Sequence, residues 1–449
     1  MELASDALWP DLSGDCLRDP IRSFIATGII QLANIASGVM LARILLPAGR
    51  GELAAVMLWP PVIAAIGALG ISEATVFFAA RSQSSRGHIF AAGITLAIIL
   101  SIILLPIGWL VVDQIAVNFS SEGRAAAFLY LAFIPLNQIG LIIVSLHQGS
   151  LSIARWNVLR TTVYVVYTAL IPILYALGHG TVLGFSIASL IANLTVVILG
   201  LALARGGDWF DSGPKPDGMR ALLGYGLKIH FANVVALLNE RLDQLFISLQ
   251  LPPSDLGLYV VAATAARGLG GIGDTLGTLV FPKIAHAETP ELRSRLAGRY
   301  IRAALLMSLL PVVTLIALSE WLIALVFGQS FVSAAPVMQV LLLMIIPLNV
   351  KCVMVAALKG LNHALSVGAV QSAALILSLI ALAILLPIFG LMGAAVASLV
   401  TQIAAAVMMG AEVRRRLGVG FKDQLSPCAE DVSFVLAFLK FQPKGSVHE

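Results

Sequence analysis

The sequence predicts an all-α integral membrane protein of about twelve transmembrane helices in two six-helix lobes. Three observations carry this prediction: the composition, an internal repeat and the placement of the basic residues. Of the 449 residues, 59% are hydrophobic and only 12% are charged, and the mean hydropathy is +0.95. Soluble domains carry about 25% charged residues, so this composition indicates a chain that lies in a bilayer.

Twelve apolar stretches, most of them 20 to 28 residues long, are the predicted helices. A helix of about 20 apolar residues crosses the roughly 30 Å of hydrocarbon in a bilayer. No stretch alternates with period two over the length of a strand, which argues against a membrane β-barrel. The stretches cover about residues 23–45, 53–80, 88–112, 125–148, 158–177, 181–204, 221–249, 256–281, 300–326, 334–357, 365–387 and 390–412.

The second half of the chain repeats the pattern of the first. Four segments recur in the same order, 206 to 212 positions later: 134–137 at 346–349, 184–190 at 393–399, 147–149 at 358–360, and 47–51 at 253–257. Matches at nearly one offset indicate a duplication. Duplicated membrane chains are typical of transporters, in which two similar halves rock about a site between them.

Basic residues fall almost entirely on one side of the predicted helices. With a cytoplasmic N-terminus, the cytoplasmic segments hold 21 Lys and Arg residues, and the opposite loops hold only Arg50 and Arg124. This positive-inside pattern predicts that both termini are cytoplasmic and that the lobes are parallel repeats. The net charge of +4 follows the membrane, so we expect no nucleic-acid partner. The first twenty residues carry five acidic side chains, so we expect no secretory leader.

The polar segment 205–220, which contains two adjacent glycines and two prolines, is predicted to be a cytoplasmic linker. It separates an N-terminal lobe, 23–204, from a C-terminal lobe, 221–412. A cytoplasmic segment, 1–22, precedes the lobes, and a basic cytoplasmic tail, 413–449, follows them. Around the start of the ninth stretch, Arg295, Arg299 and Arg302 share one helix face, a pattern typical of an anchor to anionic lipid; a substrate site is the alternative.

Three motifs resemble a known family. They read LARILLPAGRGEL at 41–53, RLDQL at 241–245 followed by LGLY at 256–259, and GLMGAAVAS at 390–398. Over about residues 20–415 the chain resembles bacterial polysaccharide and O-antigen flippases of the multidrug/oligosaccharidyl-lipid/polysaccharide exporter superfamily. The resemblance implies two lobes around a central V-shaped cavity in the bacterial cytoplasmic membrane. It also implies transfer of an undecaprenyl-pyrophosphate-linked glycan from the cytoplasmic to the periplasmic leaflet.

Charged residues inside the predicted helices are the candidate site, because a charge in hydrocarbon costs at least a few kcal/mol unless it faces a cavity or a partner. Four cations are candidates for pyrophosphate contact: Arg267, Lys351, Arg43 and Lys228. Arg267 comes first, since a guanidinium can bind phosphate oxygens through two bonds; its alternative is a structural ion pair with an acid of the seventh helix. Lys351 stands where the repeat has Ile139, and its alternative is snorkelling to the inner interface.

Five further charged residues are candidates for coupling or gating: Glu240, Arg241, Asp243, Glu73 and Asp274. Glu240 and Asp243 are three residues apart and therefore share a helix face. They can bind an ion or a proton, or close a gate by pairing with Arg43. Mutual pairing or solvation at the helix ends is the alternative.

Seven amide side chains are candidates for contact with sugar hydroxyls, and helix–helix hydrogen bonding is their alternative role. They are Gln31, Asn34, Asn137, Gln138, Asn233, Asn239 and Asn349. His147 and His230 are isolated, and no metal-binding or catalytic spacing accompanies them.

These observations together predict a flippase for a lipid-linked oligosaccharide that works by alternating access, without bond chemistry or a cofactor. We expect coupling to H⁺, Na⁺ or the membrane potential. The expected partners are the lipid-linked glycan, the bilayer and other membrane proteins of polysaccharide assembly. One alternative is a cation-coupled multidrug or metabolite exporter of the same superfamily, in which acids rather than arginines would dominate the cavity. Another is a membrane glycan polymerase or glycosyltransferase, which would carry a large loop, whereas the predicted outside loops are short.

Overall fold

Every regular element in the described part of the chain is a helix. The computed structural model describes residues 15–81, 86–204, 209–210, 213–267, 269–426, 431, 433 and 435, with the side chains of 15–21 and 425 left out. The predicted all-α fold is therefore confirmed over these residues. The chain divides into two compact units, Met1–Val234 and Val235–Glu449. The predicted bounds of the lobes, linker and tail stay predictions, and part of the linker lies outside the described residues.

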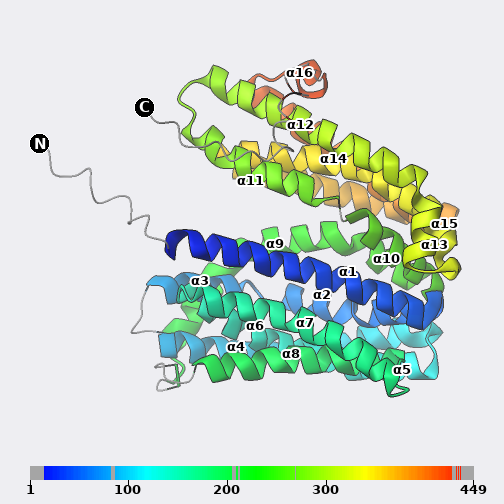
Figure 1. Cartoon of the computed structure of the whole chain (residues 1–449). Helices are drawn as coiled ribbons and strands as arrows, with labels where there is room; N and C mark the ends of the chain where they lie inside the picture. Colours follow the sequence, from blue (N-terminus) through cyan, green and yellow to red (C-terminus); the bar gives the residue numbers. More distant parts are fainter. Residues whose placement is uncertain are drawn as a thin grey trace, which may run out of the picture. The chain divides into compact units, whose positions relative to one another are not determined.

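The first unit contains most of the helices that are coloured blue to green in Figure 1. They are α1 (Asp15–Val56), α2 (Trp59–Gly67), α3 (Ile71–Arg81), α4 (Arg86–Ile115), η1 (Ala116–Asn118), α5 (Ser121–Leu129), η2 (Tyr130–Ala132), α6 (Phe133–Gly149), α7 (Ile153–Ala176), α8 (Val182–Ala204) and the first part of α9 (Pro216–Gln250).

The second unit begins within α9. It continues through α10 (Pro253–Arg267), α11 (Gly271–His286), α12 (Pro290–Ala317), α13 (Ser319–Val326), η3 (Gln329–Ala334), α14 (Ala335–Gly360), α15 (Ala364–Leu417) and α16 (Phe421–Leu425).

Within the described residues, nine helical segments are long and apolar enough to cross a membrane, or ten if α10 and α11 form one bent span. Two of them are far longer than one crossing requires: Arg22–Gly67 has 46 residues and Ala364–Leu417 has 54. Each contains a break, at Leu46 (φ 59°) and at Gly390 (φ 56°) respectively. When the long segments are divided at these breaks, each of the twelve predicted stretches falls on helical segments, although 53–80, 256–281 and 300–326 are each divided between consecutive helices. The chain is a multi-pass membrane protein.

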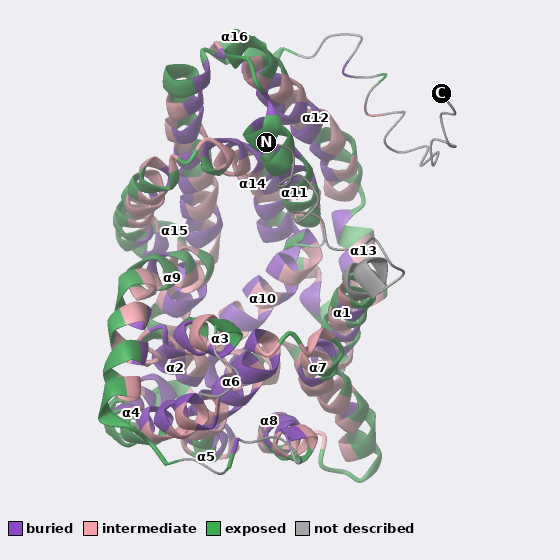
Figure 2. Ribbon diagram, turned by 90° about the vertical axis from the view of Figure 1, so that its left-hand side faces the viewer, coloured by how far each residue is buried: buried purple, intermediate pink, exposed green. Residues whose placement is uncertain are grey.

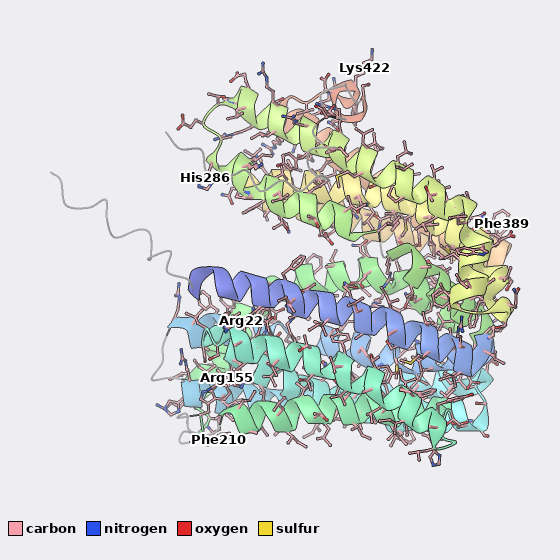
Figure 3. All side chains as sticks on the ribbon, in the orientation of Figure 1. Arg22, Arg155, Phe210, His286, Phe389 and Lys422 are labelled. Atoms are coloured by element: carbon pink, nitrogen blue, oxygen red, sulfur yellow. The ribbon has the colours of Figure 1, made fainter. Side chains whose placement is uncertain are left out.

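The break in α15 makes the chain turn back on itself. Pro387 removes one helical hydrogen bond, and Gly390 adopts a positive φ that suits glycine. Gly393 then packs against the carbonyl oxygen of Leu385, where a Cβ atom has no room. In Figure 3, Phe389 at this turn lies at one end of the second unit, and His286 and Lys422 lie at the other.

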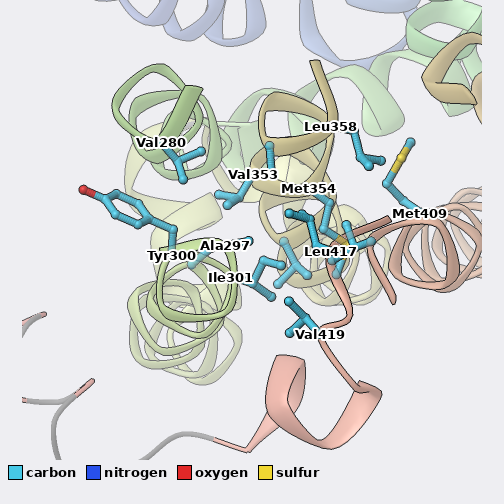
Figure 4. Packing of buried hydrophobic residues seen from close by; sticks show 14 of the residues in the cluster. Val280, Ala297, Tyr300, Ile301, Val353, Met354, Leu358, Met409, Leu417 and Val419 are labelled. Atoms are coloured by element: carbon cyan, nitrogen blue, oxygen red, sulfur yellow. The ribbon is translucent and has the colours of Figure 1, made fainter. Parts of the chain in front are cut away.

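Each unit has its own core, and α6 in the first unit and α14 in the second carry many of the buried residues (Figure 2). In the second unit α11, α12 and α15 pack against α14. Tyr300, Ile301, Val353, Met354 and Met409 belong to this cluster (Figure 4). Leu417 and Val419 extend it past the end of α15, so that the segment after the last long helix is packed onto the unit.

The first unit contains a close backbone contact between the α2–α3 turn and α9. Leu69 (φ 49°) and Gly70 (φ 69°) form the turn, and Gly70 lies against the backbone of Gly226. A Cβ atom on Gly226 would collide with the carbonyl oxygen of Leu69 and with Gly70. The contact therefore requires glycine at position 226.

We expect Gly226→Ala to destabilise the protein by about 2 kcal/mol, because the added methyl group forces two helices apart. Gly224→Ala is the matched control: it lies one half-turn away on α9, and its Cβ atom would meet nothing within 4 Å. That control should be neutral or stabilising by up to about 1 kcal/mol through helix propensity. Thermal unfolding of both variants in detergent measures the difference, and equal melting temperatures would contradict the prediction.

Candidate functional site

A cavity of about 380 Å³ lies within the second unit, between α9, α10, α11, α14 and α15. Five charged residues line it: Glu240, Asp243, Arg267, Asp274 and Lys351. Six neutral polar residues also line it: Asn239, Gln371, Ser378, Ser398, Thr401 and Gln402. The rest of the wall is largely apolar, with contributions from Met344, Leu348, Val355 and Val370. Charged groups that would be costly in hydrocarbon thus share one polar space.

The charge of Arg267 is balanced by Glu240. Arg267 Nη1 lies 3.7 Å from Glu240 Oε1, and its Nη2 donates to the backbone carbonyl of Glu240 at 3.4 Å. Arg241 also pairs with Glu240, at 3.3 Å. One of the two roles considered for Arg267 was an ion pair with an acid of the seventh predicted helix, which is α9 in the structure. That ion pair is present. All three side chains are more than a third exposed, so the pairs are solvent-screened and leave Arg267 accessible from the cavity.

Asp243 is held by a buried tyrosine. The hydroxyl of Tyr259, which is fully buried on α10, donates to Asp243 Oδ2 at 2.5 Å. The Tyr259 hydroxyl also lies 3.5 Å from Ser398 Oγ on α15. The backbone N–H of Gln244 donates to the second carboxylate oxygen at 2.8 Å. These bonds fix the Asp243 carboxylate and join three helices at one edge of the cavity.

Lys351 is held by a neutral amide. Its ammonium donates to Gln402 Oε1 at 2.6 Å, from α14 to α15. Among the described residues no carboxylate lies within 4 Å of the ammonium. An ammonium has three N–H donors, so Lys351 keeps donor capacity and an unbalanced charge for a ligand. Of the two cavity cations, Lys351 is thus the better suited to an anionic group.

Three further groups complete the lining near Lys351. Cys352 and Asp274 both line the cavity beside Lys351. Thr401 is 4% exposed, and its hydroxyl has no hydrogen-bond partner in the described structure. A buried hydroxyl without a partner is costly, so Thr401 Oγ1 is a further point at which a polar ligand can bind.

The structure brings six of the sequence-predicted residues together at this cavity: Arg267, Lys351, Glu240, Asp243, Asp274 and Asn239. Arg241 adjoins them through Glu240. Asn239 Nδ2 donates to the backbone carbonyl of Gln371 at 3.2 Å, which links α9 to α15. The roles predicted for these residues stay predictions.

The remaining predicted residues lie elsewhere. Gln31, Asn34, Arg43 and Lys228 are exposed on helices of the first unit, and Asn137 is partly buried there. Glu73 accepts from Asn233 Nδ2 at 2.8 Å within that unit. Gln138 is buried and donates to the carbonyl of Ala64 at 3.1 Å. Asn349, in the second unit, is fully buried and bonds to three groups of the protein.

Sequence reasoning missed Tyr259, Gln371, Thr401 and Gln402. The repeat offset of 209 that aligns Ser189 with Ser398 also aligns Asn193 with Gln402, so this position is polar in both copies. The same offset pairs two serines that each meet a buried tyrosine, Ser189 with Tyr130 and Ser398 with Tyr259. Comparing polar positions across the repeat could have found Gln402. The same offset aligns Gln371 with the polar Thr162, but it aligns Thr401 with Ala192, so no comparable signal exists for Thr401. Within the described residues, no group of three or more His, Cys, Asp or Glu side chains is placed to hold a metal ion.

The sequence matches a family described as "Polysaccharide biosynthesis protein" over residues 40–336. The match covers well over half of the chain. The chain belongs to this polysaccharide biosynthesis family. The match begins in α1 and ends at the start of α14, so it includes Arg267 and the acidic side of the cavity but stops before Lys351.

Solved structures show that this family member has the fold of the superfamily that its motifs indicate. A lipid II flippase, MurJ, in an inward closed conformation is similar with a TM-score of 0.76 and 14% identity, over 94% of this chain and 93% of the other. An inward-facing multidrug resistance MATE family transporter of the MOP superfamily is similar with a TM-score of 0.70 and 14% identity, over 88% of this chain and 98% of the other. A MOP superfamily transporter from Pyrococcus furiosus is similar with a TM-score of 0.59 and 16% identity, over 90% of this chain and 95% of the other. No curated protein matches the chain at a significant level.

Proposed function

We propose that this chain is a transporter, without bond chemistry of its own, that moves a lipid-linked oligosaccharide across the bacterial cytoplasmic membrane by alternating access. The observation that carries the proposal is Lys351 in the cavity of the second unit, a cation that keeps donor capacity although three acids, Glu240, Asp243 and Asp274, line the same cavity. This lining occurs in a polysaccharide biosynthesis family member whose fold is similar to that of a lipid II flippase. The family match favours a glycan-bearing substrate over a cationic drug, whereas the similar solved structures include both a lipid II flippase and a multidrug transporter.

The cavity offers separate contacts to the parts of such a substrate. Lys351 and Arg267 are the candidates for the pyrophosphate, because charge-assisted bonds to phosphate oxygens are strong. Lys351 is the stronger candidate because Arg267 is already balanced by Glu240. Gln371 and the Nε2 of Gln402 can meet sugar hydroxyls. Asn239 donates both N–H groups to backbone carbonyls and offers its Oδ1 as an acceptor.

The acids of the cavity are the proposed coupling groups. Asp243 is fixed by Tyr259, so its carboxylate is positioned independently of a substrate, and Asp274 lines the same cavity. Coupling to H⁺, to Na⁺ or to the membrane potential would act on these charges. Moving one elementary charge through 100 mV contributes about 2.3 kcal/mol, which is enough to bias two conformations.

Deletion of the gene and reconstitution of the protein together test the proposal. We expect deletion cells to lose surface polysaccharide and to accumulate a lipid-linked oligosaccharide in the inner leaflet. The lipid extracted from these cells, labelled with a fluorophore on its glycan, is then placed in liposomes with and without the purified protein. We expect the fraction of label quenched by external dithionite to rise only when the protein is present.

Two other outcomes would replace the proposal. Protein-dependent movement of ethidium, with no movement of the labelled glycan lipid, would identify a drug exporter. Protein-dependent lengthening of the glycan, read by mass spectrometry of the extracted lipid, would identify a polymerase.

A further inference from the structure

We propose that Asn349 is a wedge that divides the α10–α11 span into two halves and thereby positions Arg267 and Asp274 in the cavity. The meaning of this wedge for transport rests on the proposed function. The bend that it creates is a property of the fold and can be tested separately.

The amide of Asn349 occupies the place of one helical hydrogen bond. Leu269 and Gly273 are four residues apart, so the carbonyl of the first and the N–H of the second would bond to each other in a continuous helix. Here Asn349 Nδ2 donates to the Leu269 carbonyl at 3.2 Å, and Asn349 Oδ1 accepts from the Gly273 N–H at 3.0 Å. A side chain inserted between the two partners of a helical bond is an established cause of sharp kinks. The span bends by 42° at this point.

The surroundings of Asn349 fix the wedge. The side chain is fully buried, and Nδ2 makes a second bond of 2.8 Å to Ser308 Oγ on α12. Gly273 approaches the Asn349 backbone so closely that a Cβ atom would lie 2.6 Å from the Asn349 Cα atom. The wedge therefore needs both an amide at position 349 and a glycine at position 273.

The wedge lies between the charges of the cavity. Arg267 is the last residue of α10, and Asp274 is in the first turn of α11. Lys351 is two residues beyond Asn349 on α14. If the amide withdrew, the Leu269 carbonyl and Gly273 N–H could bond to each other, the span would straighten, and Asp274 would move relative to Arg267. In both arrangements the Leu269 carbonyl and the Gly273 N–H have partners, so straightening leaves neither group unpaired.

The first unit makes its corresponding break differently. Asn137 is the repeat equivalent of Asn349, but the residue that reaches the broken helix is its neighbour Gln138, which donates to the Ala64 carbonyl. This bond caps one side only, and the positive φ angles of Leu69 and Gly70 make the turn. Of these two described breaks, the one in the second unit has an amide between two helical partners, and that unit holds the cavity.

Spin labels at the far ends of the two halves measure the bend. Cysteines replace Ser254 on α10 and His286 on α11, in full-length protein in which Cys16, Cys352 and Cys428 are serines. The labelled protein is examined by double electron–electron resonance. With a rise of about 1.5 Å per residue, straightening the span lengthens the label-to-label distance by about 3 Å. We expect Asn349→Leu to give this longer distance or a distribution that extends to it, and to lose transport of the glycan lipid.

Two further variants make the test decisive. Ser308→Ala removes the third bond of Asn349 but leaves the wedge, so the distance should match that of the parent protein. Asn349→Ala removes both the donor to Leu269 and the acceptor for Gly273 with a smaller side chain; it serves if the leucine variant does not fold, and we expect a broadened distribution. A distance within 1 Å of the parent in each Asn349 variant that folds would overturn the wedge. If the protein with its own three cysteines moves no glycan lipid while the bend is altered in the labelled Asn349 variants, the proposed function is overturned and the wedge stands.

Discussion

Lys351→Gln is expected to lower transport of the lipid-linked oligosaccharide by about 10- to 100-fold. The substitution keeps a long polar side chain but removes the charge that Gln402 orients toward the cavity. A hydrogen bond to a charged group contributes about 1.5–3 kcal/mol, and about 1.4 kcal/mol corresponds to a tenfold change. The dithionite-quenching rate in liposomes with equal amounts of protein measures the effect.

Lys359→Gln is the matched control for this prediction. Lys359 is on the same helix, about two turns later, and is exposed outside the cavity. The substitution changes the net charge equally, so transport should stay within twofold of the parent. An equal loss of transport in the two variants would mean that the net charge of α14, and not a contact of Lys351 in the cavity, determines the rate. Unchanged transport in Lys351→Gln would exclude Lys351 as a substrate contact.

Arg302→Ala is expected to destabilise the second unit by about 3 kcal/mol. Arg302 on α12 binds Asp431 through two bonds, Nε to Oδ2 at 2.6 Å and Nη2 to Oδ1 at 3.2 Å. Its Nη1 also donates to the carbonyl of Asp423. The Asp431 side chain is 1% exposed, and that of Arg302 is 17% exposed. Removing one partner of a buried ion pair typically costs about 3–5 kcal/mol, because the other charge stays desolvated.

Denaturant unfolding in detergent, with limited proteolysis after α15 as a local readout, measures this prediction. Arg295→Ala provides the control, since Arg295 is exposed on the same helix two turns earlier. This substitution should change the free energy of unfolding by no more than about 0.5 kcal/mol. Asp431→Ala should restore part of the stability when it is combined with Arg302→Ala, because the buried charge is then gone. Equal stability of the parent and Arg302→Ala would show that the Arg302–Asp431 ion pair does not stabilise the packing of the segment after α15.

The ion pair also changes the interpretation of the α12 arginines. From the sequence, Arg295, Arg299 and Arg302 form one basic stripe, typical of an anchor to anionic lipid. In the structure Arg302 fastens the segment that follows α15, because the acid at position 431 returns to α12 although it is 129 residues away. Helical periodicity places three side chains on one face, but it contains no information about which of them meets a partner distant in the chain.

The sequence alone determined the class of the protein, the positions of its helices and the list of its unusual charges. The length of an apolar stretch and the placement of charges are local properties of the sequence, and the thickness and polarity of the bilayer select for both. The predicted stretches therefore fall on helical segments. The duplication and the motifs at 41–53, 241–259 and 390–398 likewise indicated the superfamily whose fold was found.

Only the tertiary structure decided how those charges and amides are used. Arg267 and Lys351 are both cations in apolar helices, yet one is balanced by Glu240 and the other is held by the neutral Gln402. Asn137 and Asn349 are equivalent in the repeat, yet only Asn349 enters the backbone bonding of a neighbouring helix. The physical reason is that hydrogen bonds and ion pairs act over about 3 to 4 Å. Which groups come that close is decided by helix packing, to which the whole chain contributes.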